Sequence, residues 1–85
     1  MEIEFTKKAQ LDLDYWKKSG NKIIQRKISE LLEDLQVHPF EGVGKPEALK
    51  YSLSGSWSRR ISLEHRMVYE VIDEIIYIQS LRGHY

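Results

Sequence analysis

The side chains best suited to chemistry are cations in the second half of the chain. Thirteen basic and thirteen acidic residues give a formal net charge of zero, yet residues 45–66 carry five cations against only Glu47 and Glu64. This central cation group consists of Lys45, Lys50, Arg59, Arg60 and Arg66. Its three arginines fall in segments with strand-like patterns, where a guanidinium usually has a specific partner. The uneven distribution favours a polyanion as that partner, although the net charge alone argues against one.

A second group of cations, the N-terminal cation group, occupies residues 7–27. It holds seven basic residues against Asp12 and Asp14. The seven are Lys7, Lys8, Lys17, Lys18, Lys22, Arg26 and Lys27. A charge run of this kind is as typical of a solvated helix face as of a docking surface, so both interpretations stay open.

The sequence offers little to metal or disulfide chemistry. It has no cysteine, and its three histidines, His38, His65 and His84, show none of the short spacings of metal ligands. We interpret His38 and His65 as loop residues. A composition of 41% hydrophobic and 31% charged residues predicts one globular domain over residues 1–85. Its core is so small that a protein partner is the best remaining stabiliser.

The polar residues must be positioned by an α+β fold. The alternation in residues 2–5 predicts a short strand, and Thr6 can cap a helix that runs to Gly20. Asn21 can cap a second helix, which should end before Pro39 and form an antiparallel hairpin with the first. The second helix has an apolar stripe formed by Ile24, Ile28, Leu31, Leu32 and Leu35. The aromatic residues expected in the core or an interface are Trp16, Trp57, Tyr69 and Tyr77.

Three more strands are predicted after an ordered loop. The loop spans residues 38–50, and the strands span residues 57–63, 66–72 and 75–81. The two-residue gaps between these strands leave room only for antiparallel hairpins. The order is βααβββ, and the two-helix hairpin is expected to pack on one face of an antiparallel sheet. Alternation assigns Ser58, Arg60 and Ser62 to the opposite, open face.

Short motifs occur along the chain in a definite order. They are Tyr15-Trp16, Pro39-Phe40-Glu41-Gly42, the segment GKPEALK from Gly44, Leu53-Ser54-Gly55, the segment WSRRI from Trp57, Glu64-His65-Arg66, Val68-Tyr69 and His84-Tyr85. In this order and spacing the chain resembles the YoeB/Txe branch of the RelE toxin superfamily. The resemblance covers essentially all 85 residues, and so many motifs in register make it specific.

The resemblance implies both an activity and a site. Members of the family are ribosome-dependent endonucleases of messenger RNA, held inactive by an antitoxin encoded beside them. The family's catalytic acid falls on Glu47, its catalytic arginine on Arg66 and its catalytic histidine on His84. The positions that support the site and bind substrate fall on Lys50, Arg60 and Tyr85. One departure is Gly83, where relatives tend to carry a bulky aromatic residue.

These residue types also fit the cutting of RNA without a metal. That reaction needs a base for the ribose 2′-OH proton, a cation for the charge on the phosphorus oxygens, and an acid for the departing 5′-oxygen. Glu47, Arg66 and His84 supply one of each. Taken singly, each has a plainer interpretation. Glu47 would be a solvated carboxylate, Arg66 would pair with Glu64 or Glu70, and His84 would belong to a frayed tail.

The resemblance implies partners as well. They are a YefM-like antitoxin, the ribosome and its messenger RNA, and a homodimer is compatible with the family; no cofactor is implied. The acidic start of the chain and the lack of a long apolar run predict a cytoplasmic protein that does not enter a membrane. Two other functions stay open. One is a non-catalytic toxin of the same fold that binds DNA gyrase, and the other is an inactive corepressor that only pairs with an antitoxin.

Overall fold

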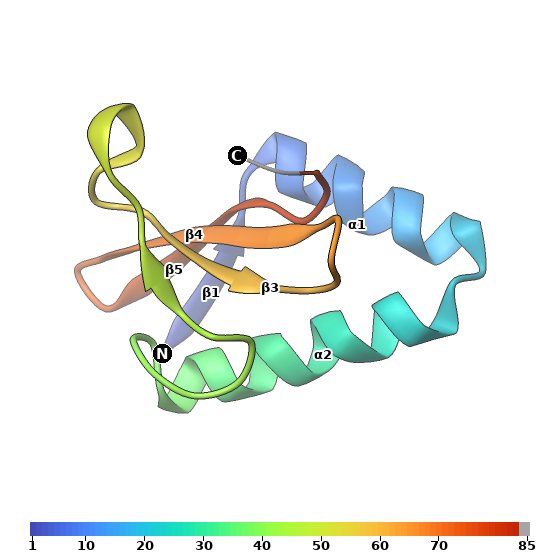
Figure 1. Ribbon diagram of the computed structural model, residues 1–85, viewed down its shortest axis with the longest axis horizontal. Coiled ribbons are helices and arrows are strands. Elements are labelled where there is room, and N and C mark those ends of the chain that lie inside the picture. Colours follow the sequence, from blue (N-terminus) through green and yellow to red (C-terminus); the bar gives the residue numbers. More distant parts are fainter. Residues whose placement is uncertain (84–85) are drawn as a thin grey trace.

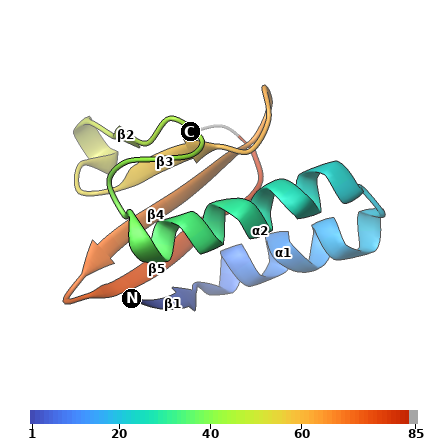
Figure 2. The same cartoon turned by 90° about the horizontal axis from the view of Figure 1, so that it is seen from below.

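The computed structural model describes residues 1–83, which form a helical layer and a sheet layer (Figure 1, Figure 2). The elements are β1 (Glu2–Phe5), α1 (Lys7–Ser19), α2 (Lys22–Val37), β2 (Glu47–Ala48), a short 3-10 helix (Tyr51–Leu53), β3 (Trp57–Arg60), β4 (Arg66–Ile72) and β5 (Ile75–Ser80). The strand order in the sheet is β1-β5-β4-β3-β2. Both helices lie on one face of this sheet (Figure 2). The α+β class and the helical hairpin are therefore confirmed.

The helices are capped by the residues that the sequence predicts. The Thr6 hydroxyl accepts a hydrogen bond from the Ala9 amide, and the Asn21 side chain accepts one from the Ile24 amide. Gly20 follows α1 with φ 74°, a left-handed conformation that a residue without a Cβ adopts at little cost. These caps fix the turn of the hairpin, because they satisfy groups that lack a partner inside the helices. Neither helix in residues 1–83 has the length and apolar character to cross a membrane.

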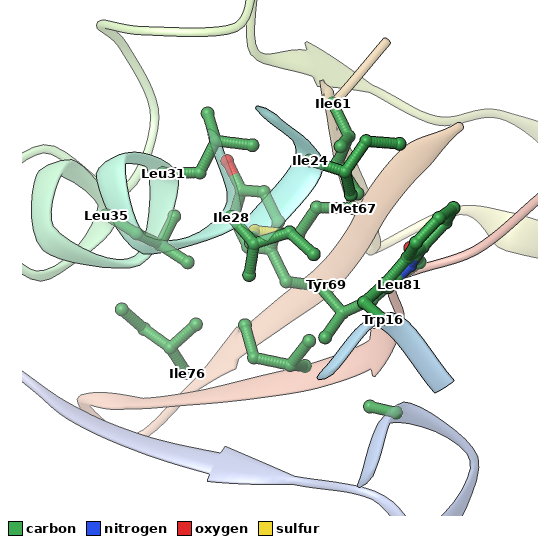
Figure 3. Close-up of a cluster of buried hydrophobic side chains, with 12 residues drawn as sticks. Trp16, Ile24, Ile28, Leu31, Leu35, Ile61, Met67, Tyr69, Ile76 and Leu81 are labelled. Atoms are coloured by element: carbon green, nitrogen blue, oxygen red, sulfur yellow. The ribbon is translucent and has the colours of Figure 1, made fainter. Parts of the chain in front are cut away.

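The core lies between α2 and the sheet (Figure 3). The predicted apolar stripe of α2 meets side chains of β4 and β5, and Trp16 of α1 packs beside Leu81 at one end. The buried residues from α2 are Ile24, Ile28, Leu31 and Leu35, and those from the two strands are Met67, Tyr69, Ile76 and Ile78. The predicted core positions of Trp16 and Tyr69 are confirmed. Since the core uses one face of the sheet, the other face can carry polar groups.

The sheet differs from the prediction in two places. β1 runs parallel to β5, so the sheet is mixed and the expectation of a fully antiparallel sheet is wrong there. Side-chain alternation does not specify strand direction, because either direction buries the same residues. In addition, β2 lies within the predicted loop and pairs Glu47 with Ser58 and Ala48 with Trp57. A strand of two residues is too short to show a period in the sequence.

The two connections that follow β3 behave differently. β3 ends at Arg60, earlier than predicted, because the amides of Ile61 and Ser62 both donate to the His65 carbonyl and turn the chain. The second connection, Asp73-Glu74, is the predicted two-residue hairpin. Its residues have φ values of 49° and 66°, as a type I′ turn requires, although neither is glycine.

Candidate functional site

The strand register brings three of the predicted site residues onto one face of the sheet. Glu47 of β2 lies opposite Ser58 of β3, and Arg60 of β3 lies opposite Arg66 of β4. Opposite residues in an antiparallel pair project to the same face, and so do residues two apart on one strand. Glu47, Arg60 and Arg66 therefore share the open face. Arg59, between them in sequence, projects toward the helices.

Arg66 is the first residue of β4, and its backbone lies beside the segment that follows β5. Its Nη1 donates to the Ser62 carbonyl at 3.0 Å, which sets the direction of the side chain. Its backbone amide donates to the Gly83 carbonyl at 3.0 Å. Among the ion pairs formed within residues 1–83, none joins Arg66 to Glu64 or Glu70. The plainer interpretation of Arg66 as half of a cross-strand ion pair is therefore not supported.

Glu47 and Lys50 line a pocket beside the open face. The segment of residues 47–53 encloses a volume of about 420 Å³. Leu49 is buried and its amide donates to the Ser56 carbonyl at 2.9 Å, so the segment is attached to the chain just before β3. The side chains of Glu47 and Lys50 themselves are exposed. A carboxylate and an ammonium on an anchored segment can both meet a ligand that arrives from solvent.

Helix α1 anchors the segment that follows β5. Asp12 Oδ2 accepts the Leu81 amide at 3.0 Å, and Trp16 Nε1 donates to the Leu81 carbonyl at 2.9 Å. Asp12 and Trp16 are both buried, and Lys8 neutralises Asp12 at 2.7 Å. Both backbone groups of Leu81 are therefore bound by side chains of one helix. The position of the backbone just after β5 is therefore fixed relative to α1.

A second anchor follows two residues later. His65 Nδ1 accepts the Gly83 amide at 2.8 Å, while the Gly83 carbonyl binds the Arg66 amide. Gly83 has φ 94°, a conformation that glycine adopts far more readily than other residues. The predicted site residues His84 and Tyr85 lie outside the described residues. They follow directly on this anchored glycine in the sequence.

Two of these anchoring residues were not recognised in the sequence. His65 is more than a loop residue, because its ring also meets Trp16 edge to face with the ring centroids 4.8 Å apart. The available signal was its place directly before Arg66 in the Glu64-His65-Arg66 motif. Asp12, which the charge pattern grouped with a solvated face, is buried. The spacing of α1 carried a signal, because Asp12 lies three residues after Ala9 and four before Trp16, on the helix face that both of them bury.

Arg59 belongs to the central cation group but does not face a polyanion. Its side chain is 0% exposed and forms an ion pair with Asp34 of α2 at 2.7 Å. It also donates to the carbonyls of His38, Glu41 and Val43. The hydrogen bond from Arg59, and after it the one from the Val43 amide, holds the pKa of Asp34 below its ordinary value. The expectation that the whole group serves a polyanion is therefore wrong for Arg59, which ties the loop after α2 to the sheet.

The N-terminal cation group lies on the helical layer. Lys8 is paired with Asp12, as described above. Lys17, Lys18 and Lys22 are exposed and lie within three residues of the turn between α1 and α2. These three lysines lie at the helical turn, whereas Arg60 and Arg66 lie on the open face of the sheet, so these two sets of cations belong to different surfaces.

The open face of the sheet brings together a carboxylate and two guanidinium groups, and the chain continues from Gly83 to His84. Glu47 offers a carboxylate, Arg60 and Arg66 offer guanidinium donors, and His84 follows the anchored Gly83 in the chain. Guanidinium groups bind phosphate oxygens, and a carboxylate can accept a proton. Within residues 1–83, no three histidine, aspartate or glutamate side chains are grouped so as to hold a metal ion.

Comparison with known proteins relates nearly the whole chain to one protein family. The profile of the family described as "YoeB-like toxin of bacterial type II toxin-antitoxin system" matches residues 5–85. Toxin YoeB of Escherichia coli K12 is 46% identical over 85 residues, which is all of both chains. The solved YoeB/ParE toxin from Agrobacterium tumefaciens superposes with a TM-score of 0.95 at 36% identity, and 100% of each chain is covered.

Solved structures of YoeB from Staphylococcus aureus are similar as well. The YoeB–YefM complex gives a TM-score of 0.88 at 44% identity, covering 100% of this chain and 98% of that one. The YoeB dimer gives 0.88 at 43% identity with the same coverage. Fold and matches together define the class of protein, a toxin of a bacterial type II toxin–antitoxin system. Within that class, the chain belongs to the YoeB-like toxin family, which confirms the resemblance carried by the motifs.

Proposed function

We propose that this toxin is an endoribonuclease that cuts messenger RNA on the ribosome and so inhibits translation, without a metal ion. The observation that carries the proposal is the shared open face of Glu47, Arg60 and Arg66, with Gly83 anchored beside Arg66. Membership in the YoeB-like family supports it. Catalysis is assigned to Glu47, Arg66 and His84.

In the proposed reaction Glu47 takes the proton of a ribose 2′-OH. The freed oxygen attacks the adjacent phosphorus, and the bond from phosphorus to the 5′-oxygen of the next nucleotide breaks. Arg66 stabilises the negative charge that builds on the non-bridging oxygens, because its guanidinium presents several donors in a plane. His84 gives a proton to the departing 5′-oxygen. The products are a 2′,3′-cyclic phosphate and a free 5′-hydroxyl.

Lys50, Arg60 and Tyr85 are assigned to substrate binding. Lys50 lines the same pocket as Glu47, so an RNA strand that reaches the carboxylate also meets the ammonium. Arg60 lies opposite Arg66 in the β3–β4 ladder, next to the phosphate that would be attacked. Cations on both sides of Glu47 would hold the phosphates that flank the cleaved bond.

The proposal is tested by adding the purified toxin to ribosomes that translate a defined messenger RNA and mapping the RNA ends. The expected result is new ends with a 5′-hydroxyl inside the ribosome-bound codons, unchanged when zinc and manganese are chelated. The matched control is His84→Gln, which should neither cleave nor arrest growth while keeping the melting temperature. It should keep the fold because His84 lies beyond β5.

The outcomes separate the remaining functions. Growth arrest without new RNA ends would overturn the ribonuclease and favour a toxin that acts by binding. Neither arrest nor cleavage by a folded toxin would favour a corepressor. Full activity of the His84→Gln variant would remove the histidine from the mechanism.

The proposed partner is a YefM-like antitoxin, supported by the YoeB–YefM complex of S. aureus. We expect an acidic, initially disordered segment of that antitoxin to bind across the open face, because exposed cations on a half-covered sheet attract a chain carrying Asp and Glu. The S. aureus YoeB dimer supports a homodimer of the free toxin.

Antitoxin binding should raise the melting temperature of the toxin. A ligand of the folded state at about 100 times its Kd adds about 2.7 kcal/mol of stability. The double variant Lys50→Ala/Arg60→Ala should weaken antitoxin binding measured by calorimetry. The charge-matched control Lys17→Ala/Lys18→Ala, on the helical layer, should bind as the unaltered toxin does. Weaker antitoxin binding by Lys17→Ala/Lys18→Ala than by Lys50→Ala/Arg60→Ala would place the antitoxin on the helices instead of the sheet.

A further inference from the structure

We infer that His65 is a positioning residue of the proposed ribonuclease site, holding the segment that leads to His84 in register with Arg66. The inference rests on the proposed function, because it names what holds Gly83, the residue before the proposed acid, against the proposed phosphate-binding arginine. Its basis is the hydrogen bond from the Gly83 amide to His65 Nδ1, at 2.8 Å.

The geometry makes Gly83 a clamped residue. The Gly83 amide donates to the side chain of His65. The Gly83 carbonyl accepts from the backbone amide of Arg66, the residue that follows His65. Two bonds on opposite sides of one residue prevent it from turning about either bond alone. Without the imidazole acceptor only the bond to the Arg66 amide remains, and the chain beyond Gly83 can pivot about it. Gly83 has no side chain to resist such a rotation.

His65 is itself held in place by α1. Its ring lies edge to face against Trp16, whose indole Nε1 binds the Leu81 carbonyl. One buried tryptophan therefore supports both anchors of the tail, directly at Leu81 and through His65 at Gly83. The anchors are two residues apart, so the backbone direction is set on entry to His84.

The hydrogen bond also dictates the chemistry of the ring. A nitrogen that accepts a hydrogen bond carries no proton, so the neutral His65 must hold its proton on Nε2. This separates a positioning role from mere packing. Packing needs only a flat ring of the right size against Trp16, whereas positioning needs an acceptor where Nδ1 stands.

Two variants isolate the acceptor from the ring. His65→Phe keeps an aromatic ring against Trp16 and removes the acceptor. His65→Asn removes the ring and keeps an acceptor, because its Oδ1 is as many bonds from the backbone as Nδ1. Single-turnover cleavage on ribosomes is measured together with ribosome binding, melting temperature and hydrogen exchange of the Gly83 amide.

We expect His65→Phe to lower the cleavage rate at saturating enzyme by up to about 100-fold, because a displacement of about 1 Å in a reacting group can cost that much. Ribosome binding should be unchanged. His65→Asn should recover most of the rate, and the Gly83 amide should be protected from exchange in His65→Asn but not in His65→Phe. The opposite order of rates, or equal rates in the two variants, would overturn the inference.

Two further readouts keep the inference testable on its own. If His65→Phe fails to fold, the imidazole nitrogen spectrum of the unaltered toxin decides, since a proton found on Nδ1 would overturn the inference. If the unaltered toxin cuts no RNA, the proposed function fails instead. Exchange of the Gly83 amide in the variants then still shows whether His65 holds the tail.

Discussion

An Arg66→Ala toxin is expected to bind ribosomes almost as the unaltered toxin does and to cleave messenger RNA about 10²- to 10³-fold more slowly at saturating enzyme. The guanidinium of Arg66 is directed by the Ser62 carbonyl. A cation that meets charge only as it develops acts on the chemical step, so its loss lowers kcat more than binding. The backbone amide that binds Gly83 remains in this variant, so the tail keeps that anchor.

The triple variant Lys17→Ala/Lys18→Ala/Lys22→Ala provides the contrast. These lysines are exposed around the helical turn. Phosphate docking by such residues is additive and screened by salt, with about one unit of salt slope for each contact. The variant should bind ribosomes more weakly, with a shallower salt dependence, and regain full cleavage when the enzyme saturates them.

Binding and single-turnover cleavage, measured at several salt concentrations, distinguish the two roles. Arg66→Lys is a useful intermediate, because it keeps the charge and loses the planar set of donors. It should recover only part of the cleavage rate. A loss of ribosome binding in Arg66→Ala that matches its loss of cleavage would make Arg66 a docking residue and remove it from the catalytic step.

An Arg59→Leu toxin is expected to lose about 2 to 3 kcal/mol of its free energy of unfolding, because removing the buried guanidinium leaves the groups that it satisfied without their donor. Those groups are the Asp34 carboxylate and the carbonyls of His38, Glu41 and Val43. Domains are stable by only about 5–15 kcal/mol, so the loss is a large fraction of the total.

Urea unfolding measures this effect, and Arg60→Leu is the matched control. Arg60 is the next residue, is exposed and lies on the other face of the sheet, so its loss should change stability by no more than about 0.5 kcal/mol. Equal unfolding midpoints for Arg59→Leu and Arg60→Leu would show that the hydrogen bonds and ion pair of the buried Arg59 contribute nothing net to stability.

The same ion pair gives stability a dependence on pH. The folded pKa of Asp34 lies below its ordinary value of 3.8, chiefly through the hydrogen bond from Arg59. A lowered pKa means that the stabilising contribution is complete above the unfolded value and is lost as pH falls through the folded one. Unfolding midpoints of the unaltered toxin should therefore fall below about pH 4 more steeply than those of Arg59→Leu.

Tyr69 contributes at the other end of the pH range. The pKa of the Tyr69 phenol lies above its ordinary value of 10.0, and burial is the largest cause of this shift. The neutral phenol donates to the Pro39 carbonyl at 2.7 Å, so it helps to hold the same loop as Arg59. A raised pKa gives stability that is complete below the unfolded value and is lost as pH rises through the folded one.

Local features of the fold could be predicted from the sequence because they depend on neighbouring residues. The caps Thr6 and Asn21 and the left-handed Gly20 each act within one turn of a helix. The parallel direction of β1 and the existence of β2 could not be predicted, since each depends on a strand far away in the chain. Pairing between distant strands leaves no period in the residues that pair.

In the candidate site, too, the residue types could be predicted from the sequence but the contacts between distant segments could not. Residue type and motif make Glu47 and Arg66 candidates for the site, but their common face depends on the pairing of β2 with β3 and of β3 with β4. Alternation correctly separates Arg59 from Arg60. It does not show that Arg59 has Asp34 as a partner, because that contact comes from another layer of the fold.

The pairing of β1 with β5 has a consequence for the order of events during synthesis. The two strands come from opposite ends of the described chain, and at about 5–20 residues per second the second is made several seconds after the first. Until then α2 lacks part of the sheet on which it packs, and β1 lacks the strand with which it pairs. The five-stranded sheet, and with it the shared face of Glu47 and Arg66, therefore forms in full only after β5 has been synthesised.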